Sequence, residues 1–302
     1  MISRMVALVL LLLMGAAWGL QFAMLKLAST SGYSDIQVLV LALASISVIY
    51  GVWVIGRGNG FRFSRDNIGF FVITAILGYI LPISGTLMVA PYLSAGVIVI
   101  LASLSPVVTF ATAALFRTER LTGCRIVALL VGVGAVLVIL LPGADTRNLS
   151  LWALLALIVP ICYGVESVYV DLRWPRNMDV VQVGFGEALV ALILVLPLFV
   201  FDEAATWRID SFGSGSLAVL VFVLCGVFEI VAYFHLIRTT GGVLVSFGTF
   251  VSLFAGIGWG ILLFDERHGW VTWFAGALMT ISLFLVVLDT IADQLKTKSD
   301  VG

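Results

Sequence analysis

Three carboxylates lie inside segments that are otherwise almost entirely apolar: Glu166, Glu187 and Glu229. A carboxylate in hydrocarbon costs roughly 2.5–3.5 kcal/mol or more unless it is paired or hydrated, so each one needs a reason to be there. One reason is a structural ion pair, because arginines follow these segments along the chain, namely Arg173, Arg176 and Arg238. The other reason is binding of a substrate amine or a proton. Binding suits Glu229 best, since Tyr233 follows it by one helical turn.

Two aromatic–glycine pairs, Trp18-Gly19 and Tyr163-Gly164, fall near the middle of long apolar segments. Trp and Tyr usually favour the membrane interfaces, so at mid-depth we expect them to face the protein interior, where their N–H and O–H groups find partners. Phe22 shares the helix face of Trp18, and the glycines let a neighbouring helix approach closely. This face is either a packed helix–helix seam or one wall of an aromatic-lined cavity.

Three prolines interrupt apolar segments: Pro82, Pro106 and Pro160. Each removes one backbone hydrogen bond and tends to kink a helix. Tyr79 and Ser103 each lie about one turn before a proline. The kinks are either purely structural or points at which helices bend during function, and the sequence leaves both alternatives open.

Composition places these residues in a membrane protein. The chain has 302 residues, of which 62% are hydrophobic and only 11% charged, and its mean hydropathy is +1.18. A soluble domain carries about 25% charged residues. The net charge of −1 argues against a nucleic-acid partner, and three scattered cysteines with two histidines predict no metal site. No P-loop, GxSxG or HExxH motif is present, so we expect neither an enzyme, nor a cofactor, nor an ATP-driven pump.

Apolar segments of about 20 residues recur, each long enough to cross a bilayer as a helix. They predict an all-α membrane protein, because they are continuously apolar rather than alternating with the period of a strand. We expect the first segment to be a retained helix, since it is longer than the apolar region of a signal peptide. The ten predicted helices are 5–28, 36–56, 66–90, 93–116, 121–142, 149–171, 180–201, 213–236, 242–264 and 269–291.

The basic residues predict the orientation of the chain, because cytoplasmic loops are enriched in Lys and Arg. With ten spans and both termini cytoplasmic in the bacterial inner membrane, twelve basic residues lie inside and four outside. The four outer ones are Lys26, Arg147, Arg208 and Arg267. Lys26 lies near the outer end of its helix, where we expect its side chain to reach water rather than a ligand.

The chain also repeats. Residues 114–140 resemble residues 262–288, and a shift of 147 places Glu119 on Glu266. A shift of 145 places Trp18-Gly19 on Tyr163-Gly164. The sequence therefore predicts two five-helix halves, 1–144 and 145–302. Because five is odd, the halves enter the membrane in opposite directions, as in secondary transporters with a substrate site between inverted repeats.

These features resemble the drug/metabolite transporter superfamily, specifically its EamA-type carriers. The matching residues are Trp18-Gly19, Tyr163-Gly164, LSPVVTFATAALFRTERLTG at 104–123 and FDERHGW at 264–270. The chain is most similar to the YddG-type exporters of aromatic and other amino acids. The resemblance implies ten helices, cytoplasmic termini and export of small metabolites from a central cavity. The second half departs from the pattern at Leu253 or Ser252, one of which aligns with Pro106, and at Tyr163, which aligns with Trp18.

We therefore expect a monomeric carrier that exports amino acids, aromatic or large and apolar, by alternating access. The residues expected to line its path are Trp18, Phe22, Tyr79, Ser103, Tyr163, Glu229 and Tyr233, with bending at Pro82, Pro106 and Pro160. The alternative is an antiporter of nucleotide sugars or phosphorylated metabolites. Such substrates call for several Lys or Arg at mid-depth, which the sequence does not provide. A channel or a membrane-embedded enzyme ranks lower, because no filter sequence, ring of charge or catalytic motif is present.

Overall fold

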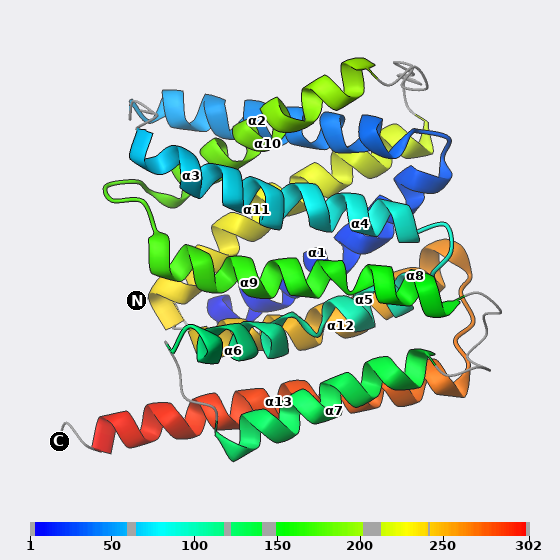
Figure 1. Ribbon diagram of the computed structural model, residues 1–302, viewed down its shortest axis with the longest axis vertical. Coiled ribbons are helices and arrows are strands. Elements are labelled where there is room, and N and C mark those ends of the chain that lie inside the picture. The colour runs from blue at the N-terminus through cyan, green and yellow to red at the C-terminus, as the bar shows by residue number, and fades with distance from the viewer. Residues whose placement is uncertain are drawn as a thin grey trace.

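The computed structural model describes residues 4–58, 65–117, 122–140, 149–201, 213–240 and 242–299, and within these ranges the regular structure is helical. The helices lie side by side in one bundle (Figure 1). They are α1 (Arg4–Thr30), α2 (Asp35–Gly56), α3 (Arg65–Thr74), the π-helical segment η1 (Ala75–Ile80), α4 (Leu81–Val89), α5 (Ala95–Ala102), α6 (Ser105–Leu115), α7 (Gly123–Leu140), α8 (Leu149–Ala156), α9 (Ile158–Arg173), α10 (Val180–Phe201), α11 (Ser214–Thr240), α12 (Gly242–Phe264) and α13 (Trp270–Ser299).

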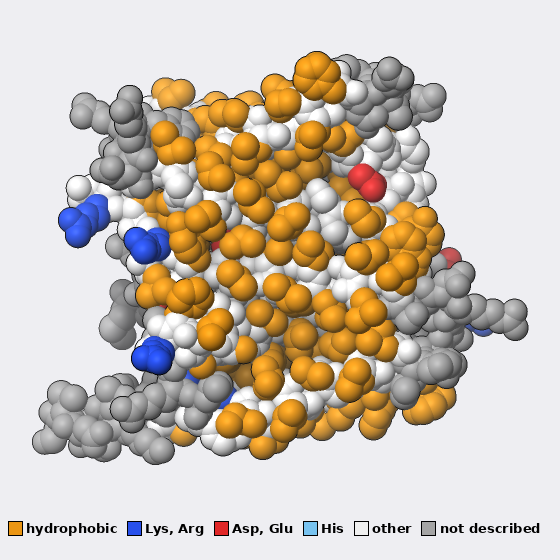
Figure 2. Space-filling view, in the orientation of Figure 1, with side chains coloured by type: hydrophobic (Ala, Val, Ile, Leu, Met, Phe, Trp, Pro, Cys, Tyr) orange, Lys and Arg blue, Asp and Glu red, His pale blue; other side chains and the backbone are white. Residues whose placement is uncertain are grey.

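The helices have the length and composition of membrane spans. Nine spans in the described chain are long and apolar enough to cross a bilayer, and Gly248–Phe264 forms a shorter apolar helix. Hydrophobic side chains cover most of the face shown in Figure 2. A surface of this kind is solvated by lipid rather than water, so the prediction of an all-α membrane protein is confirmed. All ten predicted segments fall on helices; most ends lie within four residues of those predicted, but α13 continues to Ser299 where 291 was predicted.

Three of the ten segments are interrupted, each just before a proline. The π-helical segment η1 ends two residues before Pro82, the break between α5 and α6 precedes Pro106, and the break between α8 and α9 precedes Pro160. Pro106 has no N–H to donate to the carbonyl of Ala102, and the Ser105 hydroxyl donates to that carbonyl instead, at 2.6 Å. The interruptions that these prolines predict are therefore present, whereas Pro197 lies inside α10 without one.

Helix pairs that join the two halves of the sequence build the bundle. α2 packs against α10 at one edge and α7 packs against α13 at the opposite edge (Figure 1). Between these pairs, α1 contacts α11 and α12, and α9 contacts α4 and α6. The start of α1 and the end of α13 lie at the same end of the bundle, where most of the Lys and Arg side chains visible in Figure 2 also lie.

Two of the predicted glycines sit where helices come closest. A Cβ atom on Gly19 of α1 would lie 2.5 Å from the backbone nitrogen of Gly256 in α12. One on Gly164 of α9 would lie 2.6 Å from the Cβ of Val108 in α6. Both distances are shorter than side chains tolerate, so only glycine fits at either position. The prediction that these glycines admit a neighbouring helix is confirmed.

Candidate functional site

The three carboxylates converge although they come from three different helices. Glu166 lies on α9, Glu187 on α10 and Glu229 on α11, and the charge of Glu166 interacts with those of both the others. Each side chain is partly accessible rather than sealed in the core. We call these three residues the carboxylate cluster. The charged form of a carboxyl group is costly in an apolar bundle, so each member of the cluster either takes up a proton or gains from a positive group nearby.

A hydrogen bond from α1 holds one member of the carboxylate cluster. Gln21 Nε2 donates to Glu229 Oε2 at 2.7 Å, and the Trp18 indole, on the same helix, lies near that carboxylate. The Thr74 hydroxyl of α3 lies near Glu187, but it donates to the Phe70 carbonyl of its own helix at 3.1 Å. Glu229 is therefore positioned by a donor from the other half of the chain.

The position of Glu166 is set by the shape of the neighbouring helix rather than by hydrogen-bond donors. Its carboxylate lies against the backbone of Gly78, where a Cβ atom would collide with it. Gly78 belongs to η1, and π-helical turns of this kind are frequent at functional sites. The π-helical turn, a glycine that has no side chain and the carboxylate of Glu166 therefore occur together at one position.

Tyrosines surround the carboxylates. Tyr79 of η1 lies in the electrostatic field of all three, and Tyr163 of α9 in that of Glu229 and Glu166. The rings of Trp18 and Tyr233 lie 6.2 Å apart with an interplanar angle of 46°. The resulting site is acidic and walled by aromatic rings, which attract ammonium groups through their negatively charged faces.

Tyr50 of α2 completes the wall and was not predicted from the sequence. It is fully buried, it lies in the field of Glu229 and Glu187, and its hydroxyl has no hydrogen-bond partner among the residues that the structure describes. A buried hydroxyl without a partner costs about 1–3 kcal/mol. A polar residue in the middle of the apolar segment 36–56 was the available signal.

The cluster has no counter-charge in the described part of the chain: no Lys, Arg or His there contributes to the charge environment of the three carboxylates. Arg173 and Arg176 are exposed at the end of α9 and in the loop that follows, and neither pairs with them. The ion-pair alternative is wrong for these two arginines, because they face outward while the carboxylates face inward. The side chain of Arg238 lies outside the described residues.

Five of the seven residues expected to line a path gather at this site: Trp18, Tyr79, Tyr163, Glu229 and Tyr233. The other two lie elsewhere. Phe22 is partly buried and packs against the hydrophobic core that α5, α7 and α13 share. Ser103 is 4% exposed and its hydroxyl donates to the Val99 carbonyl of its own helix at 2.7 Å, so it offers no group to a ligand.

A second polar cluster lies at the other end of α1 and has a different character. Lys26 Nζ donates to Glu266 Oε1 at 2.7 Å and to the Leu93 carbonyl at 2.8 Å. The expectation that Lys26 reaches water is wrong, because an acceptor from the loop between α12 and α13 meets it inside the protein. Lys26 also lies over the ring of Phe264, with Nζ 5.1 Å from the ring centroid.

Glu266 in turn caps α5. Its carboxylate accepts the backbone N–H of Ala95 at 2.7 Å and that of Gly96 at 3.3 Å. These are free donors of the first helical turn, where the helix dipole favours a negative charge. His268 Nε2 lies 3.6 Å from the same carboxylate. We call Lys26, Glu266 and their partners the clamp, since they join α1, α5 and the loop before α13. Glu119, which the sequence repeat aligns with Glu266, lies outside the described residues.

Comparison with known proteins now identifies the family. The sequence profile of the EamA-like transporter family matches residues 5–141 and again residues 150–288. The chain belongs to the EamA-like transporter family. No curated protein matches it in sequence. A solved structure titled "Crystal structure of protein" has a similar fold, with a TM-score of 0.64, 17% sequence identity and coverage of 97% of this chain and 99% of that one.

The double match means that this EamA-like transporter contains the family unit twice, once in each half of the sequence. As a family member it is an integral membrane protein of the drug/metabolite transporter superfamily. The resemblance in the sequence is confirmed at this level.

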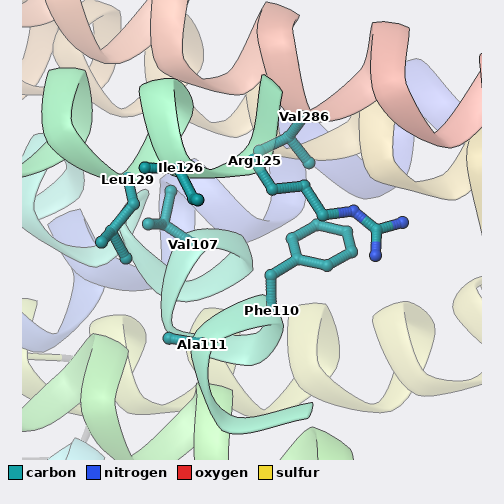
Figure 3. Close-up of a pocket in the computed structure, with 7 residues that line it drawn as sticks. All are labelled: Val107, Phe110, Ala111, Arg125, Ile126, Leu129 and Val286. Atoms are coloured by element: carbon teal, nitrogen blue, oxygen red, sulfur yellow. The ribbon is translucent and has the colours of Figure 1, made fainter. Parts of the chain in front are cut away.

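The transporter also has an apolar pocket between α6, α7 and α13, remote from the carboxylate cluster in the sequence. It is lined by Val107, Phe110, Ala111, Arg125, Ile126, Leu129 and Val286 (Figure 3). The Arg125 guanidinium stacks over the Phe110 ring at 4.5 Å and its Nε lies 2.6 Å from Asp289 Oδ2. Because Arg125, the one charged residue among those that line the pocket, is already paired with Asp289, the pocket offers hydrophobic contact alone. The Arg125–Asp289 pair joins α7 to α13.

Proposed function

We propose that this transporter is a secondary exporter that moves amino acids with large apolar side chains across the bacterial inner membrane, and that Glu229 binds the substrate amine. The observation that carries the proposal is the setting of Glu229. Gln21 of α1 holds its carboxylate in place, and the rings of Trp18 and Tyr233 lie beside it. An ammonium group fits between a fixed carboxylate and aromatic faces.

The packing of the bundle supports an inverted repeat as the basis of alternating access. The first helix of the first half, α1, contacts α11 and α12 of the second half. The first helix of the second half, α9, contacts α4 and α6 of the first. Two halves related by a twofold axis exchange contacts in this reciprocal way. The carboxylate cluster lies on the second half, whereas Gln21 of the first half donates to Glu229, so the site as a whole draws on both halves, as a site between inverted repeats does.

The breaks near Pro82, Pro106 and Pro160 supply bending points for such a mechanism. Two of the broken segments, α5–α6 and α8–α9, pack against each other through α6 and α9. The segment that contains η1 carries Tyr79 directly to the carboxylates. Bending at these points would move the walls of the site without unfolding a helix. We propose a monomer with both termini in the cytoplasm, since the basic residues of the sequence favour that side.

The charge of the site disfavours the alternative substrates. A phosphorylated metabolite or nucleotide sugar is an anion, and three carboxylates without a described cation nearby repel it. An amine is attracted by the same charges. Recognition of an amine therefore accounts for a cluster that phosphate transport leaves unexplained.

Counterflow into liposomes that contain the full chain tests the proposal. Labelled phenylalanine and methionine should exchange, while UDP-sugars and triose phosphates should not. Glu229→Gln should raise the half-saturation concentration for phenylalanine by about tenfold, the loss of roughly 1.4 kcal/mol of binding. Asp35→Asn, which changes an exposed carboxylate at the start of α2, is the matched control and should behave as wild type. Exchange of the phosphorylated solutes without that of amino acids would refute the proposal.

A further inference from the structure

We propose that the clamp is the latch of the outer gate, so that the transporter without substrate rests closed to the outside. A latch is a contact that must break before that end of the bundle opens. The inference rests on the proposed alternating access and on the proposed orientation, in which the end of the bundle opposite the start of α1 faces outward. It does not depend on which solute the transporter carries.

The hydrogen bonds by which the clamp joins the two halves all pass through one carboxylate, that of Glu266 in the second half. Its partners in the first half are Lys26 Nζ at 2.7 Å and the backbone N–H groups of Ala95, at 2.7 Å, and Gly96, at 3.3 Å. The bond from Lys26 to the Leu93 carbonyl stays within the first half. A contact within one half would leave the halves free to rock against each other, whereas Glu266 holds them together.

The loop between α12 and α13 is shaped to present this carboxylate. Asp265 has a φ of 50°, in the left-handed region that Asp tolerates better than most residues, and the Glu266 N–H donates to the Gly260 carbonyl at 3.3 Å. The His268 ring lies against Gly96, where a Cβ atom would be 2.6 Å from Cε1. The loop of the second half therefore fits the start of α5 in shape as well as in charge.

The clamp lies where water can reach its charges once it opens. The side chains of Lys26 and Glu266 are 15% and 9% exposed, and the loop residues on either side of Glu266, Asp265 and Arg267, are exposed. Separation of α1 from the loop would hydrate both charges, so neither would be stranded in an apolar interior. The contact can therefore break and form again, as a gate requires.

The sequence repeat gives the opposite end of the bundle no equivalent ion pair. The shift of 145 that relates the first helices of the two halves places Lys26 on Asp171. The shift of 147 places Glu266 on Glu119. Both equivalents are acidic, and two carboxylates repel each other. An attraction that exists at one end alone favours the conformation in which that end is closed.

Two further contacts between the halves at the clamp end are weaker. Tyr33 Oη lies 2.6 Å from Ser216 Oγ, and Ser31 Oγ lies 3.1 Å from Ser214 Oγ. All four groups are neutral hydroxyls, and hydrogen bonds with an ionised partner are roughly twice as strong as neutral ones. The clamp is therefore the contact that decides whether this end opens.

The test measures how fast a buried cysteine reacts with a thiol reagent in the purified full chain, without substrate and with the native cysteines replaced by serine. Ala23→Cys reports on the clamp end, because Ala23 is fully buried on α1 one turn before Lys26. Val168→Cys is the matched reporter for the other end, since the shift of 145 places Ala23 on Val168, which is 6% exposed. With the clamp intact, Ala23→Cys should be protected, and its fast reaction would refute the inference.

Glu266→Gln should increase the reaction rate of Ala23→Cys by about tenfold, because the population of the open conformation rises, and should not increase that of Val168→Cys. Asp289→Asn is the matched control, since Asp289 forms a buried ion pair with Arg125 at 2.6 Å between α7 and α13. It should leave Ala23→Cys protected. Equal acceleration of both reporters by Glu266→Gln would indicate a loosened bundle and would contradict a latch.

The double variant Lys26→Met/Glu266→Gln distinguishes a latch from a purely structural contact. Neither charge is stranded in it, so it should melt close to wild type, yet Ala23→Cys should still react fast because the attraction is gone. If the double variant protects Ala23→Cys as well as the intact clamp does, the clamp only stabilises the fold and the inference is wrong. No solute enters this experiment, so its result is separate from the counterflow test, and the latch can fail while the proposed function stands.

Discussion

The clamp and the carboxylate cluster place the same residue type in opposite circumstances. Glu266 has a lysine at 2.7 Å and two backbone N–H donors, so its charge and its lone pairs are satisfied. The carboxylate cluster has one side-chain donor, Gln21 to Glu229, and no cation among the residues that the structure describes. Both groups lie within an apolar bundle where an unbalanced charge is costly.

We infer from this difference that the clamp holds the structure, whereas the carboxylate cluster is the candidate for binding a ligand. A balanced cluster gains nothing from a further partner, and removing one member strands the other. An unbalanced cluster is stabilised by any cation that enters it. Local violation of charge balance is expected at functional sites, where the rest of the fold compensates for it. The carboxylate cluster, rather than the clamp, therefore carries the proposed binding.

The side of the membrane on which the clamp lies can be tested in an all-or-none way. In a variant without the native cysteines, Arg267→Cys next to the clamp should react with an impermeant thiol reagent only from outside the cell. Arg176→Cys, in the loop after α9, should react only from the cytoplasm. Both positions are exposed. Labelling of both from one side would contradict the ten-span topology and the inverted repeat.

Breaking the clamp should reduce stability more than any change in the carboxylate cluster. Glu266→Gln leaves Lys26 without its counter-charge, and the loss of one partner of a buried pair costs about 3–5 kcal/mol. Thermal melting in detergent measures the effect. The double variant Lys26→Met/Glu266→Gln should recover most of the loss, because neither charge is then stranded. A single variant that melts like wild type would show that the clamp is not structural.

A Glu→Gln change within the carboxylate cluster should affect stability in the opposite direction. Glu166→Gln removes a negative charge that has no described cation, so it should leave stability unchanged or raise it by about 0.5–2 kcal/mol. Measuring the melting temperatures of Glu166→Gln and Glu266→Gln under the same conditions gives the comparison directly. If Glu166→Gln melts several degrees lower than wild type, the carboxylate has a structural partner and the contrast between the two clusters fails.

Trp18 provides the test with the smallest expected effect. It is partly accessible, whereas Met14 on the same helix is buried and serves for comparison. Trp18→Ala should weaken transport with a stability loss below the 3–5 kcal/mol typical of a fully buried aromatic side chain, about 1 kcal/mol or less. Met14→Ala is the control: Met14 is fully buried in the same helix and should lose about 2–5 kcal/mol. Normal transport by a poorly stable Trp18→Ala variant would show that Trp18 contributes to packing rather than to transport.

Much of the architecture was predictable from local sequence. The ten apolar segments, the three interruptions near prolines, and the close approach at Gly19 and Gly164 were all visible there. Lipid offers no hydrogen bonds to the backbone, so a continuous apolar run must form a helix whatever its neighbours are. A proline likewise removes its hydrogen bond in any context. These outcomes depend on a residue and its immediate surroundings alone.

The partners of the polar residues required the tertiary structure. Lys26 and Glu266 are 240 positions apart, and nothing near Lys26 in the sequence indicates that an acceptor replaces water. Gln21 and Glu229 are 208 apart, and the convergence of three helices with α1, α2 and η1 around them was equally hidden. Local sequence indicated where the apolar helices lie and that three of the segments are interrupted before a proline, because the bilayer acts on each segment separately. Which polar groups meet was decided only when the helices packed, since the energy of a buried charge depends on whatever lies within a few ångströms of it.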